Sequence, residues 1–159
     1  MVVLTLVLAW VGRPLQTVAA PRGILDFEFA GTAERAREIL ASWSPLARQQ
    51  AAFSLGLDYL YIPVYAAALG SVCLWAGDRL RSRRLSGQGL GTLLAWGLGL
   101  AALLDAVENA ALARILFYGP EPVWPAVASL CAGGKFAVIL CSAIYLLLSL
   151  VFLIRSRSD

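Results

Sequence analysis

Two acids and an amide interrupt the apolar stretch LLDAVENAALARIL, residues 103–116. Asp105 and Glu108 are three residues apart and Asp105 and Asn109 are four apart, so on a helix their side chains project from one face. Carboxyl groups buried together can bind a proton, a metal ion or a cationic molecule, and one with a raised pKa can act as a general acid or base. The spacing therefore predicts a polar site on one helix face.

Two other apolar stretches contain ionisable residues. Asp58 is followed by Tyr61 and Tyr65, which share its helix face, and Lys135, the single lysine of the sequence, lies in a third stretch. If each stretch crosses a membrane as a helix rising about 1.5 Å per residue, the ionisable groups of Asp58, Asp105, Glu108 and Lys135 lie about 11 to 18 Å below the outer boundary. The three stretches thus place polar groups at similar depths.

These residues are expected to form one cluster, because an ionisable group in hydrocarbon costs about 2.5 to 3.5 kcal/mol and turns inward. Lys135 would pair with one of three carboxyl groups, which leaves an excess of two negative charges. Either some carboxyl groups are protonated, or a cation or cationic ligand completes the site. The residues predicted to bind a ligand or ion are Asp58, Tyr61, Tyr65, Asp105, Glu108, Asn109 and Lys135.

Three interpretations of this cluster stay open. It could bind or translocate a proton, a cation or a small cationic or polar ligand. It could only fix helix packing in a structural or accessory membrane subunit. It could also serve a lipid-active enzyme, with Glu108 or Asp105 as acid or base and Lys135 stabilising an anion. No complete catalytic motif occurs, so no catalytic residue is predicted and a role other than catalysis is favoured.

The sequence contains no histidine, which excludes imidazole-ligated zinc, copper, haem and di-iron sites and every triad with a histidine base. Its three cysteines, Cys73, Cys131 and Cys141, lie in hydrophobic stretches without a CxxC or paired spacing, which is typical of free thiols. We therefore expect no metal site and no cofactor.

The elements that must position these residues are apolar helices. The 159 residues are 60% hydrophobic and 14% charged, with a mean hydropathy of +0.75, which indicates a membrane protein. A helix needs about 20 apolar residues to cross a membrane. The sequence predicts an all-α fold with one membrane domain, 1–159, as an up-down bundle of four transmembrane helices at about 1–20, 51–77, 89–116 and 123–154.

The first of these spans is the weakest, because Arg13 and Pro14 interrupt it. It also resembles a signal peptide, with the small-residue run TVAA before Pro21. A missing basic region at its start and the presence of Met1 favour a retained helix.

The segment between the first two spans contains an expected amphipathic helix, at about 32–43, outside the cytoplasm. Ala36, Ile39, Leu40 and Trp43 recur there at helical spacing. It could pack on the bundle or lie on lipid. Just before it, ILDFEF alternates apolar and acidic residues, which is typical of a short extended lid or a solvated loop.

The charges predict an orientation in the membrane. Net charge is +3, and arginines crowd residues 79–84 and follow the last span at Arg155 and Arg157. By the positive-inside rule these segments and both termini are cytoplasmic, and 22–50 and 117–122 lie outside. Arginines in a short loop are typical of such a topology signal or of anionic lipid contact, so no nucleic acid partner is expected.

Expected partners are the lipid bilayer and, through the GxxxG spacing of Gly87 and Gly91, either another helix of the same chain or a homodimer or membrane protein partner. The segments ILDFEFAGTAERAREILASW, LDYLYIPVYA and LLDAVENAAL, followed by a helix with a central lysine, resemble an uncharacterised family of small bacterial integral membrane proteins. The resemblance covers most of the chain. It implies four transmembrane helices and, with the arginine-rich composition, the cytoplasmic membrane of a bacterium, and it implies no function.

Overall fold

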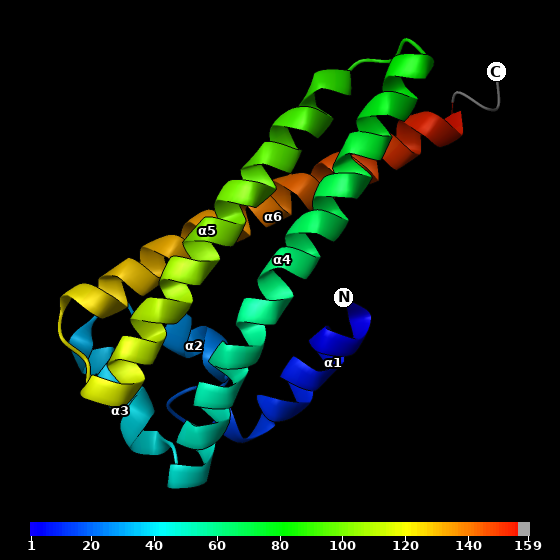
Figure 1. The fold of residues 1–159 in the computed structure, drawn as a ribbon. Coiled ribbons are helices and arrows are strands. Elements are labelled where there is room, and N and C mark those ends of the chain that lie inside the picture. The colour runs from blue at the N-terminus through cyan, green and yellow to red at the C-terminus, as the bar shows by residue number, and fades with distance from the viewer. Residues whose placement is uncertain (156–159) are drawn as a thin grey trace. The chain divides into compact units, whose positions relative to one another are not determined.

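Helices form the whole regular structure of residues 1–155, which the computed structural model describes, and no strand occurs among them (Figure 1). The short elements come first: α1 (Val2–Val11), the 3-10 turn η1 (Arg13–Leu15), α2 (Ile24–Glu28) and α3 (Ala33–Ser42). Three long helices follow: α4 (Pro45–Ser82), α5 (Gln88–Tyr118) and α6 (Val123–Arg155). Arg157, part of the predicted basic end, lies outside the described residues.

The long helices α4, α5 and α6 are the three within the described residues that are long and apolar enough to cross a membrane. Even α5, with 31 residues, reaches about 46 Å, which exceeds the roughly 30 Å of the hydrocarbon core. Only 33% or less of the residues in their most apolar windows are buried. Large apolar side chains such as Trp96 and Leu147 are 79% and 64% exposed, as expected of helices in contact with lipid.

The predicted span over residues 1–20 is not confirmed. Helix α1 has 10 residues, so it reaches about 15 Å, half of what a crossing requires. The chain then tightens into η1, which begins with Arg13 and Pro14, and Gln16 is extended. Proline lacks the backbone N–H that would continue the helix, and this explains why the apolar stretch does not form one long helix.

The chain divides within its described part into two compact units. Unit 1 consists of Met1–Ile62 with Leu104–Gly133, and unit 2 of Pro63–Leu103 with the described residues from Gly134 onward. Each long helix therefore contributes one segment to each unit, and unit 2 begins at Pro63, inside α4. The prediction of a single membrane domain stays a prediction.

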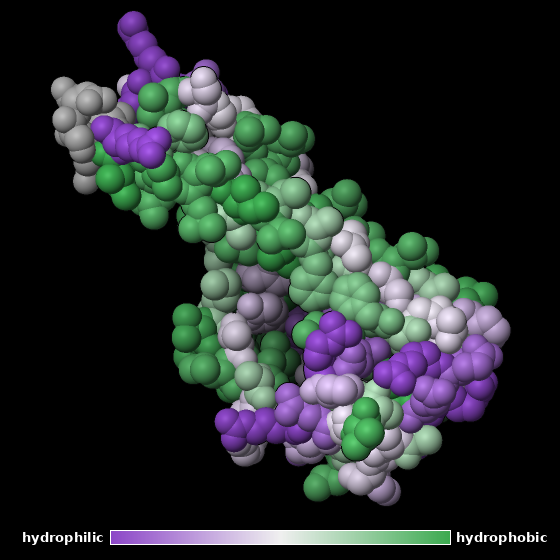
Figure 2. All heavy atoms as spheres, turned by 180° about the vertical axis from the view of Figure 1, so that it is seen from behind, coloured by the Kyte–Doolittle hydropathy of each residue, from purple (hydrophilic) through white to green (hydrophobic). Residues whose placement is uncertain are grey.

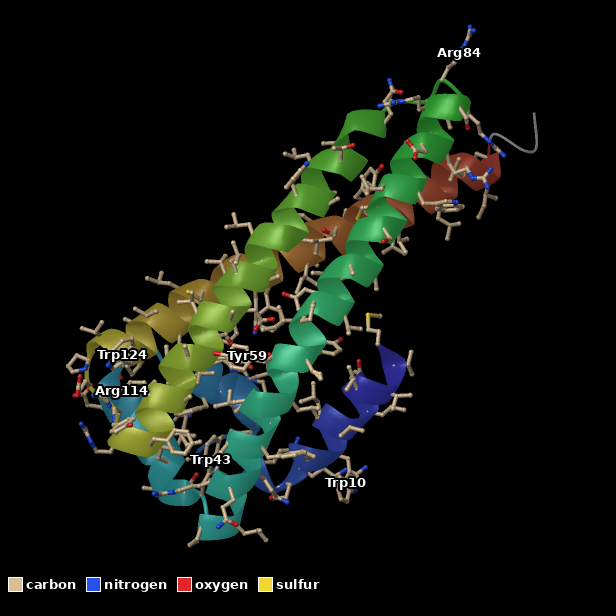
Figure 3. All side chains as sticks on the ribbon, in the orientation of Figure 1. Trp10, Trp43, Tyr59, Arg84, Arg114 and Trp124 are labelled. Atoms are coloured by element: carbon tan, nitrogen blue, oxygen red, sulfur yellow. The ribbon has the colours of Figure 1, made fainter. Side chains whose placement is uncertain are left out.

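Unit 1 has its core where η1, α2 and α3 gather around the Pro45 end of α4, the Tyr118 end of α5 and the Val123 end of α6 (Figure 1). Trp43, which Figure 3 shows among these elements, is 3% exposed. Its indole Nε1 donates a hydrogen bond to the carbonyl oxygen of Leu15, 2.9 Å away, and its ring meets the Phe27 ring edge-on, with 5.1 Å between centroids. Trp43 thus joins α2, α3 and the turn that follows α1.

Helix α3 begins at Thr32, whose side chain accepts a hydrogen bond from the backbone N–H of Arg35. Its buried residues include Ala36, Ile39 and Leu40, which belong to the same core as Leu112 of α5. The apolar face of α3 therefore packs against the other helices of unit 1.

The segment ILDFEF is helical from Ile24 to Glu28, neither extended nor a solvated loop. It buries Asp26, Phe27 and Glu28 together. Because α2 is only 5 residues long, its sequence is too short to show a helical period. The alternation of apolar and acidic residues instead favoured an extended lid or a loop, and that prediction was wrong.

Unit 2 is built on a close crossing of α4 and α5. A Cβ atom placed on Gly91 would overlap the carbonyl oxygen of Cys73 and lie 2.9 Å from the hydroxyl of Tyr145. A Cβ atom on Gly77 would lie 2.8 Å from the carbonyl oxygen of Gln88. Gly91, one of the two glycines in the GxxxG spacing, therefore serves close packing within the chain.

Candidate functional site

The predicted site residues are divided between the two units. Unit 1 contains Asp58, Tyr61, Asp105, Glu108 and Asn109, and unit 2 contains Tyr65 and Lys135. The polar face of α5 is buried: Asp105, Glu108 and Asn109 are 3%, 0% and 2% exposed. Tyr65 and Lys135 are buried as well. The pairing of Lys135 with a carboxyl group stays a prediction.

In unit 1, Asp58 and Asn109 are joined directly. The side-chain Nδ2 of Asn109 donates a hydrogen bond of 2.7 Å to the Oδ2 atom of Asp58. The hydroxyl of the next residue, Tyr59, donates to the carbonyl oxygen of Ala106, at 3.1 Å. Both bonds connect α4 to α5, and the bond between Asn109 and Asp58 joins the predicted polar face of α5 to that of α4.

Tyr61 connects α4 to the short first helix. Its hydroxyl accepts a hydrogen bond from the side chain of Thr5, 3.2 Å away, and Thr5 also donates to the carbonyl oxygen of Met1. This contact places α1 beside α4. A hollow lies between α1 and the neighbouring elements of unit 1, and it is visible beside α1 in Figure 2.

The hollow is a cavity of about 450 Å³ within unit 1. Its apolar wall comes from α1, with Leu8 and Ala9, and from Leu25 and Leu55. Its polar wall includes the side chains of Arg22, Glu28, Asp58 and Asn109. The cavity thus has an apolar side and an acidic side, and its volume is in the usual range for sites that hold small molecules.

The charged residues that line this cavity are Arg22, Glu28 and Asp58. Arg22 is bound to Asp26: its guanidinium Nε and Nη2 donate to Oδ1 at 2.9 and 2.7 Å, and its backbone N–H donates to Oδ2 at 2.7 Å. Glu28 is 8% exposed, and Asp58 is partly exposed. The acidic residues that line the cavity are therefore Glu28 and Asp58.

Burial of Asp26 raises the pKa of its carboxyl group, but the backbone and guanidinium hydrogen bonds from Arg22 lower it more, with a further contribution from the charge of Arg35. The pKa is therefore below its ordinary value. A carboxyl group whose pKa is lower in the folded protein stabilises the fold above its unfolded pKa, about 3.9. This stabilisation is lost as the pH falls through the folded pKa.

We therefore expect the thermal unfolding midpoint of the detergent-solubilised protein to fall as the pH is lowered from about 6 to about 3, and to fall less in Asp26→Asn. The matched control is Glu34→Gln, which removes an exposed acid of α3 and should leave the pH dependence unchanged. Equal pH dependence in the parent and in Asp26→Asn would show that the bonds from Arg22 do not stabilise the ionised carboxyl group.

This arrangement suits recognition of a positive charge beside an apolar body. Carboxylates attract a cation, and the amide of Asn109 fixes the orientation of Asp58 through its hydrogen bond. Within residues 1–155 no group of three or more histidine, cysteine or acidic residues could bind a metal ion. A single organic cation needs fewer charged partners than a metal ion, which requires several oxygen ligands.

Helical periodicity does not predict three contributors to the cavity. Arg22 lies in an irregular turn, Glu28 belongs to a helix too short for a period, and the residues of α1 are predicted to be part of a membrane span. The one available signal was the pair of acids in ILDFEF, a short apolar segment in which burial of an acid requires a partner.

No family model, characterised protein or solved structure matches the chain. The class of protein is therefore defined by the structure itself. The chain is an all-helical protein with three candidate membrane-spanning helices among its described residues, and its unit 1 encloses an acid-lined cavity.

Proposed function

We propose that this protein is a small integral membrane protein that binds a small organic cation with an apolar body in the cavity of unit 1. The observation that supports the proposal is the composition of the cavity: Glu28 and Asp58 on one side, and Leu8, Leu25 and Leu55 on the other. A volume of about 450 Å³ exceeds what a proton or a bare ion needs.

The membrane topology that accompanies this proposal follows from α1. Because α1 reaches only about 15 Å, the three long helices are the proposed spans, and an odd number of crossings separates the two ends of the chain. By the positive-inside rule, we propose that the arginines at 79–84 and Arg155 lie on the cytoplasmic side of the membrane. Residues 1–44, with the amphipathic α3, are then outside, and the cavity is accessible from there. We propose the cytoplasmic membrane of a bacterium as the location.

Asp105 and Glu108 are proposed as a supporting network rather than as cavity wall. Both are buried on the same face of α5 as Asn109, which bonds Asp58. Both lie in the same unit as the cavity, and in the ionised form a carboxyl group there favours a cation over an anion.

The test uses two ligands with the same skeleton and opposite charge, 4-phenylbutylamine and 4-phenylbutyrate, with the protein in a neutral detergent at pH 7. The amine should raise the thermal unfolding midpoint with concentration, because a ligand that binds only the folded form stabilises it, and the carboxylate should not. Asp58→Asn should weaken amine binding at least about tenfold, since it removes a charge and keeps an oxygen acceptor for Asn109.

The control is Glu34→Gln, which removes an acid of the same unit that is exposed and does not line the cavity. It should bind the amine as the parent does. An equal effect of the two ligands, or unchanged binding in Asp58→Asn, would contradict the proposal. If neither ligand stabilises the parent and Asp58→Asn only lowers the midpoint, the bond between Asp58 and Asn109 serves helix packing, and the structural interpretation is correct.

A further inference from the structure

A second cavity, within unit 2, lies between the last turns of α4 and α6. It has a volume of about 180 Å³ and is lined by Trp75, Arg79, Arg83, Leu150, Leu153 and Ile154. Its three residues from α4 and the link that follows are spaced by four, so they lie along one helix face. The cavity thus combines two guanidinium groups with an aromatic and aliphatic wall.

Two contacts orient the arginines. The Cζ atom of Arg79 lies 5.4 Å from the centroid of the Trp75 ring, a cation–π arrangement that holds the guanidinium against the indole. The Nη1 atom of Arg83 donates a hydrogen bond of 2.9 Å to the carbonyl oxygen of Leu153. That carbonyl group is among the last of α6, which have no hydrogen-bond partner within the helix and form its negative end. The bond from Arg83 reduces the repulsion that this end would exert on a bound anion.

The lining contains positive charge and no acid. A guanidinium group donates in a planar fork that matches the oxygen atoms of a phosphate. The remaining lining is apolar and open to the surroundings: Trp75, Leu150 and Ile154 are 54%, 55% and 57% exposed. A soluble phosphate would leave this apolar surface in contact with water, whereas the acyl chains of a lipid would cover it.

We propose that this cavity is a binding site for an anionic phospholipid. The phosphate group lies against Arg79 and Arg83, and an acyl chain follows Leu150 and Ile154. The proposal does not depend on the ligand of unit 1, and it requires only that α4 and α6 cross a membrane. In such helices a tryptophan and arginines near the helix end occupy the depth of the lipid headgroups.

The experiment measures lipid binding to the full chain in a neutral detergent, by native mass spectrometry and by the thermal unfolding midpoint. Three additions are compared: dioleoylphosphatidylglycerol, dioleoylphosphatidylcholine and inorganic phosphate. The phosphatidylglycerol should bind saturably and raise the midpoint of the parent, and the other two should do neither. In the double variant Arg79→Gln, Arg83→Gln the affinity for phosphatidylglycerol should fall at least about tenfold.

The chain offers a matched control at the same end of α4. The double variant Arg81→Gln, Arg84→Gln removes the same charge from two exposed residues that do not line the cavity. Arg84 is seen in Figure 3 to extend away from the helix ends. This control should retain the binding of the parent, since its arginines contribute only to the general positive surface.

Three results would overturn the proposal. An equal loss of binding in the control pair would mean that diffuse surface charge attracts the lipid. Equal binding of phosphatidylcholine would mean that the acyl chains alone determine the affinity. An equal effect of inorganic phosphate would identify a site for a soluble anion.

Because Arg83→Gln also removes the hydrogen bond to Leu153, the single variant Arg79→Gln, which keeps this bond, is measured as well. It should still weaken the binding of phosphatidylglycerol. Unchanged binding of 4-phenylbutylamine in these variants separates this test from that of the first cavity.

Discussion

Leucine in place of Gly91 is expected to lower the thermal unfolding midpoint strongly, because the added side chain has no space in unit 2. Already the Cβ atom would overlap the carbonyl oxygen of Cys73, and it would lie 2.9 Å from the hydroxyl of Tyr145 and 3.2 Å from the Cα atom of Gly77. Two of these three neighbours are backbone atoms, which cannot turn away as a side chain can. Overpacking of this kind typically costs about 1 to 3 kcal/mol and occasionally more, so α4 and α5 would have to separate.

Alanine at the same position should show a smaller loss in the same direction, because it adds the Cβ atom alone. The matched control is Gly99→Ala on the same helix, where no described atom lies within 4 Å of the added Cβ atom. There, alanine should be neutral or stabilising by up to about 1 kcal/mol, as its helix propensity exceeds that of glycine.

The measurement is the unfolding midpoint in detergent, together with the recovery of monodisperse protein. If Gly91→Ala were as stable as Gly99→Ala, α4 and α5 would not approach each other as closely as unit 2 requires.

Hydropathy alone was sufficient to predict the three long helices. The stretches 51–77, 89–116 and 123–154 lie inside α4, α5 and α6, because each contains enough consecutive apolar residues to decide the length of a helix. Residues 1–20 are comparably apolar, but Pro14 prevents a single helix there. A local interruption thus outweighs mean hydropathy when it falls in the middle of a marginal span.

The cavity of unit 1 shows why a site can be only partly predicted from sequence. The spacing of Asp105, Glu108 and Asn109 indicates a shared face, and that face is buried. Helical periodicity, however, reports only neighbours within one element. Glu28 lines the cavity from the short helix α2. Thr5 lines it from α1, whose residues are predicted to cross the membrane. Contacts between distant segments depend on tertiary packing, which no single period encodes.

The same reasoning applies to unit 2. Gly91 stands out in the sequence because of its GxxxG spacing with Gly87, but the glycine that it approaches is Gly77 on the preceding helix. Gly87 instead lies in the link, with a φ of 91° that suits glycine. The motif indicated a close helix contact correctly, and the partner position came only from the fold.

The largest expected loss in unit 1 is that of Trp43→Ala. Trp43 is 3% exposed, packs edge-on against Phe27 and donates its indole hydrogen bond to the carbonyl oxygen of Leu15. Removal of a buried tryptophan side chain typically costs about 3 to 5 kcal/mol, through lost burial and the void that remains. The unfolding midpoint should fall accordingly. Trp10→Ala is the control, because Trp10 is 68% exposed and extends away from unit 1 in Figure 3, so its loss in detergent should be small.

Trp43→Phe separates the hydrogen bond from the packing. The phenyl ring can still contact Phe27, but the Leu15 carbonyl oxygen loses its indole donor, which costs about 1 to 3 kcal/mol when the group is buried. Leu15 ends the turn that connects α1 to the rest of unit 1, and α1 forms the apolar wall of the cavity. Loss of this bond should therefore weaken binding of 4-phenylbutylamine as well as stability, whereas Trp10→Ala should change neither. Parent-like amine affinity in Trp43→Phe, measured well below its unfolding midpoint, would show that the wall formed by α1 does not depend on this anchor.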